Sequence, residues 1–309
     1  MKFFIYEDNI SFCKKNHCGK YSIEIANALK FSTHEQVLDP NKAQVFFTNI
    51  CNERNYEIFA SAHPEKIGNI DYFEFYQRII NLEYKHLGPH FVFFHRFDDR
   101  FQELADYLSN EGNIVNIPYH NPYFQPNKDF IISPPAIKKT FFNDNLSKNF
   151  LLSFKGNWGI RSEDGEDHRL KCLNTIAKQN KNYIVITDSK DARFDYIDLL
   201  SNSLFSLIPE GDEPWTYRLS EAICAGSIPV LLEKDWRNLP YSNIIDYNNF
   251  ALRINFQEPE LVLETIMQYS LKEISSRIEY MKSIKHLFSS RSAQIQCLLD
   301  FYEENIILN

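Results

Sequence analysis

The chain has 309 residues, of which 44% are hydrophobic and 24% are charged, and its formal net charge is −8. This length is enough for two domains, and the composition is that of an ordinary globular protein rather than a disordered or fibrous one. The negative net charge argues against a nucleic-acid partner, which requires a basic surface. The six cysteines are scattered, so neither a zinc site nor a disulfide framework is predicted.

The first half of the chain alternates short apolar runs with helical patterns. Strands are predicted at residues 2–6, 43–48, 91–94, 113–117 and 130–132, and helices at 22–31 and 73–87. This alternation predicts an α/β domain with a parallel sheet. Polar side chains follow two of the strands at their carboxyl ends. They are Glu7 and Asp8 after the first strand, and His95, Asp98 and Asp99 after the third.

A proline-rich segment, Ser133–Ile137, is followed by a polar run and marks a connector between two domains. We therefore predict one Rossmann-like domain over residues 1–137 and a second over residues 138–275. Residues 276–309 are predicted to form C-terminal helices that pack back on the first domain.

The second half repeats the alternation. Strands are predicted at residues 150–154, 183–187, 204–208 and 228–232, and helices at 167–179, 215–225, 260–277 and 278–301. The last two strands flank a helix that ends at Gly226, and together they form a βαβ unit, in which ligands gather at the carboxyl ends of the strands. The loop before this helix places four residues at the helix N-terminus, which favours an anion such as a diphosphate. They are Gly211, Asp212, Trp215 and Thr216.

Two charged residues of this helix lie three positions apart and share one helical face. They are Arg218 and Glu221, on the side opposite Leu219 and Ile223. From the pattern alone, they form either a solvated ion pair on an amphipathic crossover helix or a pair that binds a ligand.

The region from Pro209 to Tyr247 resembles the signature of the exostosin-like glycosyltransferases, family GT47. That signature reads PxGDxPW, then RLxEAIxxGxIPV, then LPxSxxIDY, and the matching segments are Pro209–Trp215, Arg218–Val230 and Leu239–Tyr247. Weaker counterparts of family phrases extend the resemblance over most of the chain, at Ala43–Asn49, Pro89–Asp98, Lys128–Pro135 and Leu151–Arg161. The sequence departs from the family at Glu210, where members often carry arginine.

The resemblance implies a GT-B fold, in which two Rossmann-like α/β domains face each other across a cleft. It also implies an inverting glycosyltransferase that moves a sugar from a UDP-sugar to a hydroxyl of a glycan acceptor. The expected partners are therefore a nucleotide-sugar donor and an oligosaccharide or glycan acceptor. Because GT-B enzymes usually work without a metal, we expect no metal site and no cofactor besides the UDP-sugar co-substrate.

Glycosyl transfer needs positive groups for the leaving diphosphate, a carboxylate for the ribose hydroxyls and a base for the acceptor hydroxyl. The resemblance implies that Glu221 binds the ribose. The diphosphate candidates are Lys155, Arg161, Arg169 and Arg218, with backbone N–H groups near Gly156 and Gly211. Pro209, Asp212, Trp215 and Thr216 complete the predicted donor site. The base is expected in the N-terminal domain, with Asp98 as first candidate and Asp99, Glu7 and His95 as rivals.

Two alternatives remain open. Glu213 and Glu221 have the EX7E spacing of retaining GT-B enzymes, but two glutamates often occur at this interval and we interpret it as a coincidence. The spacing would matter only for the first alternative, a retaining transferase or an epimerase. A non-catalytic GT-B protein that binds a nucleotide sugar is the other alternative.

The chain begins directly with a predicted strand, and no apolar run approaches the roughly eighteen residues of a membrane span. Animal and plant members of the family usually carry an N-terminal anchor. We therefore expect a cytoplasmic enzyme of microbial or viral origin, without an integral membrane segment.

Overall fold

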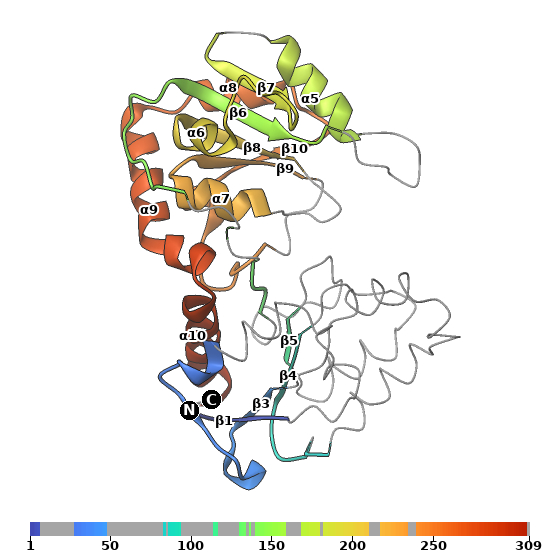
Figure 1. Ribbon diagram of the computed structural model, residues 1–309, viewed down its shortest axis with the longest axis vertical. Helices are drawn as coiled ribbons and strands as arrows, with labels where there is room; N and C mark the ends of the chain where they lie inside the picture. Colours follow the sequence, from blue (N-terminus) through green and yellow to red (C-terminus); the bar gives the residue numbers. More distant parts are fainter. Residues whose placement is uncertain are drawn as a thin grey trace, which may run out of the picture. The chain divides into compact units, whose positions relative to one another are not determined.

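The computed structural model describes most of the chain. The described residues are 1–6, 28–47, 83–84, 86–93, 114–116, 130–133, 136, 140–158, 168–179, 182–209, 217–233 and 239–307. The chain forms two compact units, which Figure 1 colours along the sequence. The N-terminal unit comprises Met1–Ile132 together with Arg291–Asn309, and the central unit comprises Ser133–Ser290.

The N-terminal unit contains a parallel five-stranded sheet in the order β2-β1-β3-β4-β5. The strands are β1 (Lys2–Ile5), β2 (Glu35–Gln36), β3 (Val45–Phe47), β4 (His90–Phe93) and β5 (Ile114–Asn116). Phe3 of β1 and Phe47 of β3 are buried and meet edge to face, with ring centroids 5.7 Å apart. Aromatic residues suit such strands because they cover a buried pleated surface well.

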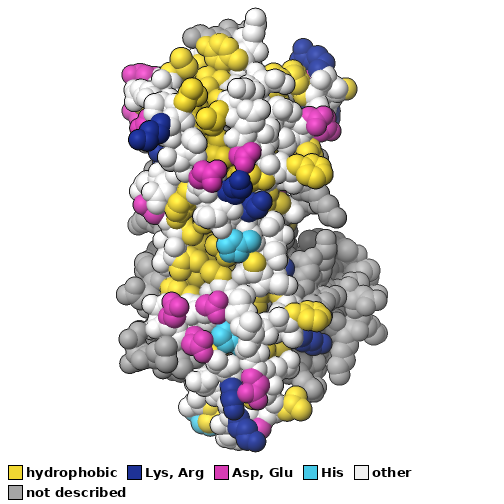
Figure 2. Space-filling view, turned by 90° about the vertical axis from the view of Figure 1, so that its left-hand side faces the viewer, with side chains coloured by type: hydrophobic (Ala, Val, Ile, Leu, Met, Phe, Trp, Pro, Cys, Tyr) yellow, Lys and Arg dark blue, Asp and Glu magenta, His cyan; other side chains and the backbone are white. Residues whose placement is uncertain are grey.

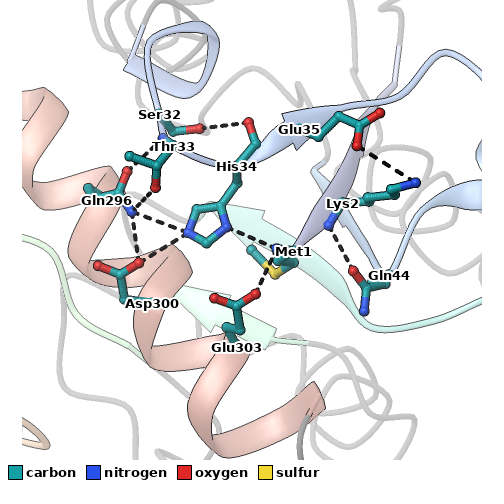
Figure 3. Close-up of polar contacts among 10 residues, drawn as sticks. All are labelled: Met1, Lys2, Ser32, Thr33, His34, Glu35, Gln44, Gln296, Asp300 and Glu303. Carbon is teal, nitrogen blue, oxygen red and sulfur yellow. Dashed lines mark hydrogen bonds and ion pairs between the residues drawn. The ribbon is translucent and has the colours of Figure 1, made fainter.

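The C-terminal helix α10 (Arg291–Tyr302) belongs to the N-terminal unit, and polar contacts join it to the start of the chain (Figure 3). The ammonium group of Met1 lies 2.7 Å from the carboxylate of Glu303, just after α10. His34 Nε2 lies 3.1 Å from the carboxylate of Asp300. Since an ammonium group only donates, Nδ1 of His34 accepts from Met1 and Nε2–H donates to Asp300.

The central unit contains a second parallel sheet, in the order β10-β9-β8-β6-β7. Its strands are β6 (Phe150–Gly156), β7 (Ile184–Asp188), β8 (Ser203–Pro209), β9 (Ile228–Glu233) and β10 (Leu252–Asn255). With the strands of each unit numbered along the chain, both sheets have the doubly wound order 2-1-3-4-5. Ligands bind such sheets at the carboxyl ends of the strands where the order reverses, which in this unit are β6 and β8.

Five α-helices lie among the described residues of the central unit. They are α5 (His168–Lys178), α6 (Tyr196–Ser201), α7 (Tyr217–Ala225), α8 (Leu261–Met267) and α9 (Leu271–Ser289). Helix α7 packs against α6 and α9 (Figure 1), and every residue from Leu219 to Ala225 is buried. The helix stops at Gly226, whose φ of +73° favours glycine, and Lys148 Nζ donates to the Gly226 carbonyl at 2.8 Å.

The α/β class and most predicted strands are confirmed, with corrections. Phe130–Ile132 is buried but is not a strand, and the Phe130 ring instead packs on Phe301, with centroids 5.2 Å apart. The helical pattern over 260–277 divides into α8 and α9, because Ser270 and Glu273 form a capping box that starts a new helix. The short elements β2, β10 and α6 were not predicted.

The two units also differ from the predicted domains. The first boundary falls after Ile132 rather than at residue 137, and the chain returns to the N-terminal unit at Arg291 rather than at residue 276. The physical reason is helix α9, which packs against α7 and so stays with the central unit.

No helix among the described residues is long and apolar enough to cross a bilayer. On the face of the molecule shown in Figure 2, most of the described Lys and Arg side chains lie beside Asp or Glu side chains, and a group of acidic side chains lies near a histidine in the lower half of the view.

Candidate functional site

The carboxyl ends of β6 and β8 bring predicted site residues together in the central unit. The two strands are paired in parallel through Ser153 and Ser206. Strand β6 ends at Gly156, and β8 ends at the buried residue Pro209. Helix α7 follows β8 and carries Arg218 and Glu221. The doubly wound topology therefore places Gly156 and Pro209 at the edge of the sheet where ligands bind.

Arg218 reaches from α7 to the end of β6. Its Nη2 donates to the carbonyl oxygen of Lys155 at 2.5 Å. The guanidinium carbon lies 4.4 Å from the ring centroid of Phe154 and 5.2 Å from that of Tyr196, so the cation contacts two aromatic rings. Desolvation lowers the pKa of Arg218, yet arginine remains charged at neutral pH. Within the described part of the chain, no carboxylate forms an ion pair with it.

Glu221 lies one turn further along α7 and is 6% exposed. The hydroxyl of Tyr196, the first residue of α6, donates to Glu221 Oε2 at 2.5 Å. Burial, and then the nearby carboxylate of Glu221, raise the pKa of Tyr196, so the phenol is protonated at neutral pH and acts as the donor. The interpretation of Arg218 and Glu221 as a solvated ion pair is therefore wrong.

The ammonium group of Lys155 points into the loop between β7 and α6. It donates to the carbonyl oxygens of Asp191 at 2.6 Å and Phe194 at 2.5 Å. The N–H of Ser189 donates to the carbonyl of Gly156 at 3.0 Å, which ties the start of the same loop to β6. Lys155 thus holds the loop that leads into Tyr196, and its predicted contact with a diphosphate stays a prediction.

Sequence analysis missed Tyr196 and Phe154 as site residues. Phe154 lies within the matched phrase Leu151–Arg161, and the local signal near Tyr196 is Asp195, which caps α6 by accepting from the N–H groups of Ile197 and Asp198. The contact between Tyr196 and Glu221 spans 25 positions in the chain, so no spacing rule reveals it.

Arg169, another predicted diphosphate residue, lies on α5, and its guanidinium carbon is 5.8 Å from the ring centroid of Phe154. The remaining predicted site residues lie outside the described part of the chain. They are Glu7, His95, Asp98, Asp99, Arg161, Gly211, Asp212, Trp215 and Thr216. Among the described residues, no group of three or more His, Cys, Asp and Glu side chains could hold a metal ion. Metal independence stays a prediction.

Comparison with known proteins identifies related sequences. The model of the exostosin GT47 domain matches residues 2–269. The exostosin-1 homolog of Caenorhabditis elegans is 25% identical over 224 residues, which cover 66% of this chain and 57% of that protein. Exostosin-1a of Danio rerio is 29% identical over 307 residues, which cover 87% of this chain and 40% of that protein. The chain therefore spans less than two thirds of the length of these relatives.

Among solved structures, similar chains include glycosyltransferases. One from Rickettsia africae ESF-5 aligns with a TM-score of 0.46 and 11% identity, covering 99% of this chain and 98% of that chain. The pneumococcal O-GlcNAc transferase GtfA, solved with UDP and GlcNAc, aligns with a TM-score of 0.41 and 14% identity, covering 94% and 60%.

The predicted fold class is confirmed, since the chain is a GT-B α/β protein with two Rossmann-like units. The expectation of a cytoplasmic enzyme of microbial or viral origin is wrong, because the curated relatives are exostosins of animals, including Caenorhabditis elegans, Drosophila melanogaster and Bos taurus. Since the domain model matches most of its length, the chain belongs to the exostosin GT47 family of glycosyltransferases.

Proposed function

We propose that the central unit binds a UDP-sugar and that the protein transfers the sugar, with inversion, to a hydroxyl of a glycan acceptor. Membership of the exostosin GT47 family supports glycosyl transfer in general. One observation supports the more specific proposal: Arg218 reaches the carboxyl end of β6, at the edge where a doubly wound sheet binds nucleotides, and it shares Tyr196 as a contact with Glu221.

Arg218 is suited to the diphosphate of the donor. A guanidinium group has five N–H donors, and the bond to Lys155 occupies one of them. Arg169 adds a second cation, because its guanidinium carbon lies 5.8 Å from the ring centroid of Phe154 that Arg218 also contacts. As the glycosidic bond breaks, negative charge builds on the diphosphate, and cations held in place beforehand stabilise that charge in the transition state.

Glu221 is suited to the ribose. Its carboxylate has about four lone-pair positions, and the hydroxyl of Tyr196 uses one of them on Oε2. The remaining positions can accept from the 2′ and 3′ hydroxyls of a nucleoside. Hydrogen bonds to a charged group contribute about 1.5–3 kcal/mol each, so loss of one hydroxyl should lower the affinity roughly 10- to 100-fold.

Inversion requires a single displacement at the anomeric carbon. The acceptor oxygen attacks the anomeric carbon on the side opposite the leaving oxygen of UDP. The bond between the anomeric carbon and that oxygen breaks, and its electron pair leaves with UDP. A base takes the proton of the acceptor hydroxyl. Asp98 remains our first candidate for the base, followed by Asp99, Glu7 and His95. In this scheme the cations of the protein stabilise the leaving diphosphate, so we also propose that no metal is needed.

The proposal is tested by calorimetric binding of UDP, GDP and CMP, followed by turnover of the matching nucleotide sugars. We expect UDP-specific binding that falls at least tenfold in Glu221→Gln and in Arg218→Met. Arg277→Met is the matched control, because Arg277 also lies over an aromatic ring, that of Tyr269, and donates to two backbone carbonyls. Activity should survive EDTA, and NMR of the product should show the inverted anomer.

Other outcomes decide between the alternatives. A product with the donor's anomeric configuration would establish a retaining enzyme. Binding of UDP without turnover on any acceptor would favour the non-catalytic alternative. Absence of nucleotide binding would overturn the proposed donor site.

A further inference from the structure

We infer that Tyr196 is a positioning residue of the donor site, which orients Glu221 through its hydroxyl and Arg218 through its ring. The inference rests on the proposed function, because it assumes that these two residues contact the donor. Among the described residues, Tyr196 contacts both of them: its hydroxyl donates to Glu221 Oε2 at 2.5 Å, and its ring centroid lies 5.2 Å from the guanidinium carbon of Arg218.

The hydroxyl of Tyr196 restricts the orientation of the Glu221 carboxylate, which would otherwise rotate freely. The terminal torsion of a glutamate is broad, so the two oxygens of an unbound carboxylate sample many orientations. A partly buried hydrogen bond to Oε2 holds the carboxylate plane of Glu221 and leaves the other lone pairs for a ligand. A ribose can then bind without first ordering the side chain, which reduces the entropic cost of binding.

Three contacts fix the backbone around Tyr196: a helix cap, a contact between two aromatic rings and a hydrogen bond. Asp195 caps the helix that Tyr196 begins. The preceding residue, Phe194, meets the ring of Phe150 edge to face, with centroids 6.1 Å apart, and its carbonyl accepts from Lys155. Lys155 lies in β6, whose end also receives Arg218, so one strand supports both the loop that leads into Tyr196 and Arg218, one of the two side chains that Tyr196 contacts.

The test compares UDP with 2′,3′-dideoxy-UDP, which keeps the diphosphate and lacks both ribose hydroxyls. Tyr196→Phe removes the hydroxyl and keeps the ring. We expect it to weaken UDP binding about tenfold and to leave binding of the dideoxy analogue within twofold, so that the preference for ribose falls. Tyr196→Leu also removes the ring, and we expect it to weaken binding of the dideoxy analogue as well, because Arg218 loses one aromatic contact.

Tyr247→Phe is the matched control. Tyr247 is another buried tyrosine of the central unit, and its hydroxyl donates to the carbonyl of Pro240 at 2.9 Å. Loss of that hydroxyl should lower the melting temperature and leave the ratio of the two affinities unchanged. A merely structural role of Tyr196 would give the same result as this control.

The inference is overturned if Tyr196→Phe leaves the ratio of affinities at its wild-type value. This result differs from a failure of the proposed function. If the proposed function fails, the wild-type protein itself binds no UDP, or binds UDP and the dideoxy analogue with equal affinity. Either result would contradict the role assigned to Glu221 as well as that of Tyr196. Circular dichroism of Tyr196→Phe, which keeps the ring in place, checks that the comparison is made on folded protein.

Discussion

The guanidinium group of Arg218 lies in the space that a side chain on Gly156 would need. A Cβ atom built on Gly156 would collide with Nη2 of Arg218 and would lie 3.0 Å from the ring of Phe154. Glycine at the end of β6 therefore allows the arginine to reach the carbonyl of Lys155. The backbone at this point approaches a charged side chain closely, which is a common use of glycine.

We predict that Gly156→Ala weakens UDP binding at least tenfold, because the methyl group displaces Arg218. Overpacking of this kind also costs about 1–3 kcal/mol in the free energy of unfolding. Calorimetry and urea denaturation measure the two effects. Gly88→Ala is the control: its Cβ would lie 3.1 Å from the carbonyl oxygen of Gln44 in the N-terminal unit, and UDP affinity should not change. Unchanged UDP affinity in Gly156→Ala would show that Arg218 does not need its present position.

We predict that Arg218→Lys weakens UDP binding 10- to 100-fold and leaves uridine binding within twofold. A lysine carries one compact charge and cannot contact a carbonyl, two aromatic faces and a phosphate together. The affinities for UDP and for uridine are measured by competition. A loss for UDP alone indicates a contact with the diphosphate, whereas general damage to the site weakens both. Equal losses for UDP and uridine would mean that Arg218 supports the fold of the site rather than the diphosphate.

Lys148 should make stability depend on pH in the alkaline range. Burial lowers the pKa of Lys148 to about 8, whereas in the unfolded chain it is near 10.5. Between these values the unfolded chain binds more protons than the folded one, so the free energy of unfolding rises with pH. This increase in the free energy of unfolding is absent below pH 8 and complete above about pH 10.5.

The measurement for Lys148 is urea denaturation of the wild-type protein and Lys148→Met at pH 7, 9 and 10.5. The difference in unfolding free energy should shift in favour of the wild type by up to about 3 kcal/mol across this range. Ionisation of cysteines acts in the opposite direction, but it is common to both proteins and cancels in the difference. Parallel pH curves for the two proteins would contradict the prediction.

Three thiols should resist alkylation while the protein is folded. Burial raises the pKa of Cys172 to about 11 and that of Cys224 and of Cys297 to about 12. Because the thiolate is the reactive form, we expect iodoacetamide at pH 8 to modify them at least a hundredfold more slowly than in urea. Mass mapping of the three peptides measures this directly. Rapid labelling of Cys224 in the folded protein would show that its helix opens readily.

Local patterns in the sequence were enough to predict most of the elements that form the site. Strands β6, β8 and β9 appeared as apolar runs, and α7 appeared as a helical pattern ending at Gly226, with the predicted and observed bounds differing by a few residues. These features depend on neighbours within one turn or one strand. The GT47 resemblance rests on local phrases too, and the match over residues 2–269 confirms it.

Tertiary structure alone decided what surrounds Arg218 and Glu221. The bond from Tyr196 to Glu221 spans 25 positions, and the bond from Arg218 to the carbonyl of Lys155 spans 63. Both depend on the strand order that brings β6 next to β8, and on the packing of α6 against α7. Sequence spacing reports only residues on the same helix face or strand, so it could identify the two charged residues but neither Tyr196 nor the close approach of Arg218 to Gly156.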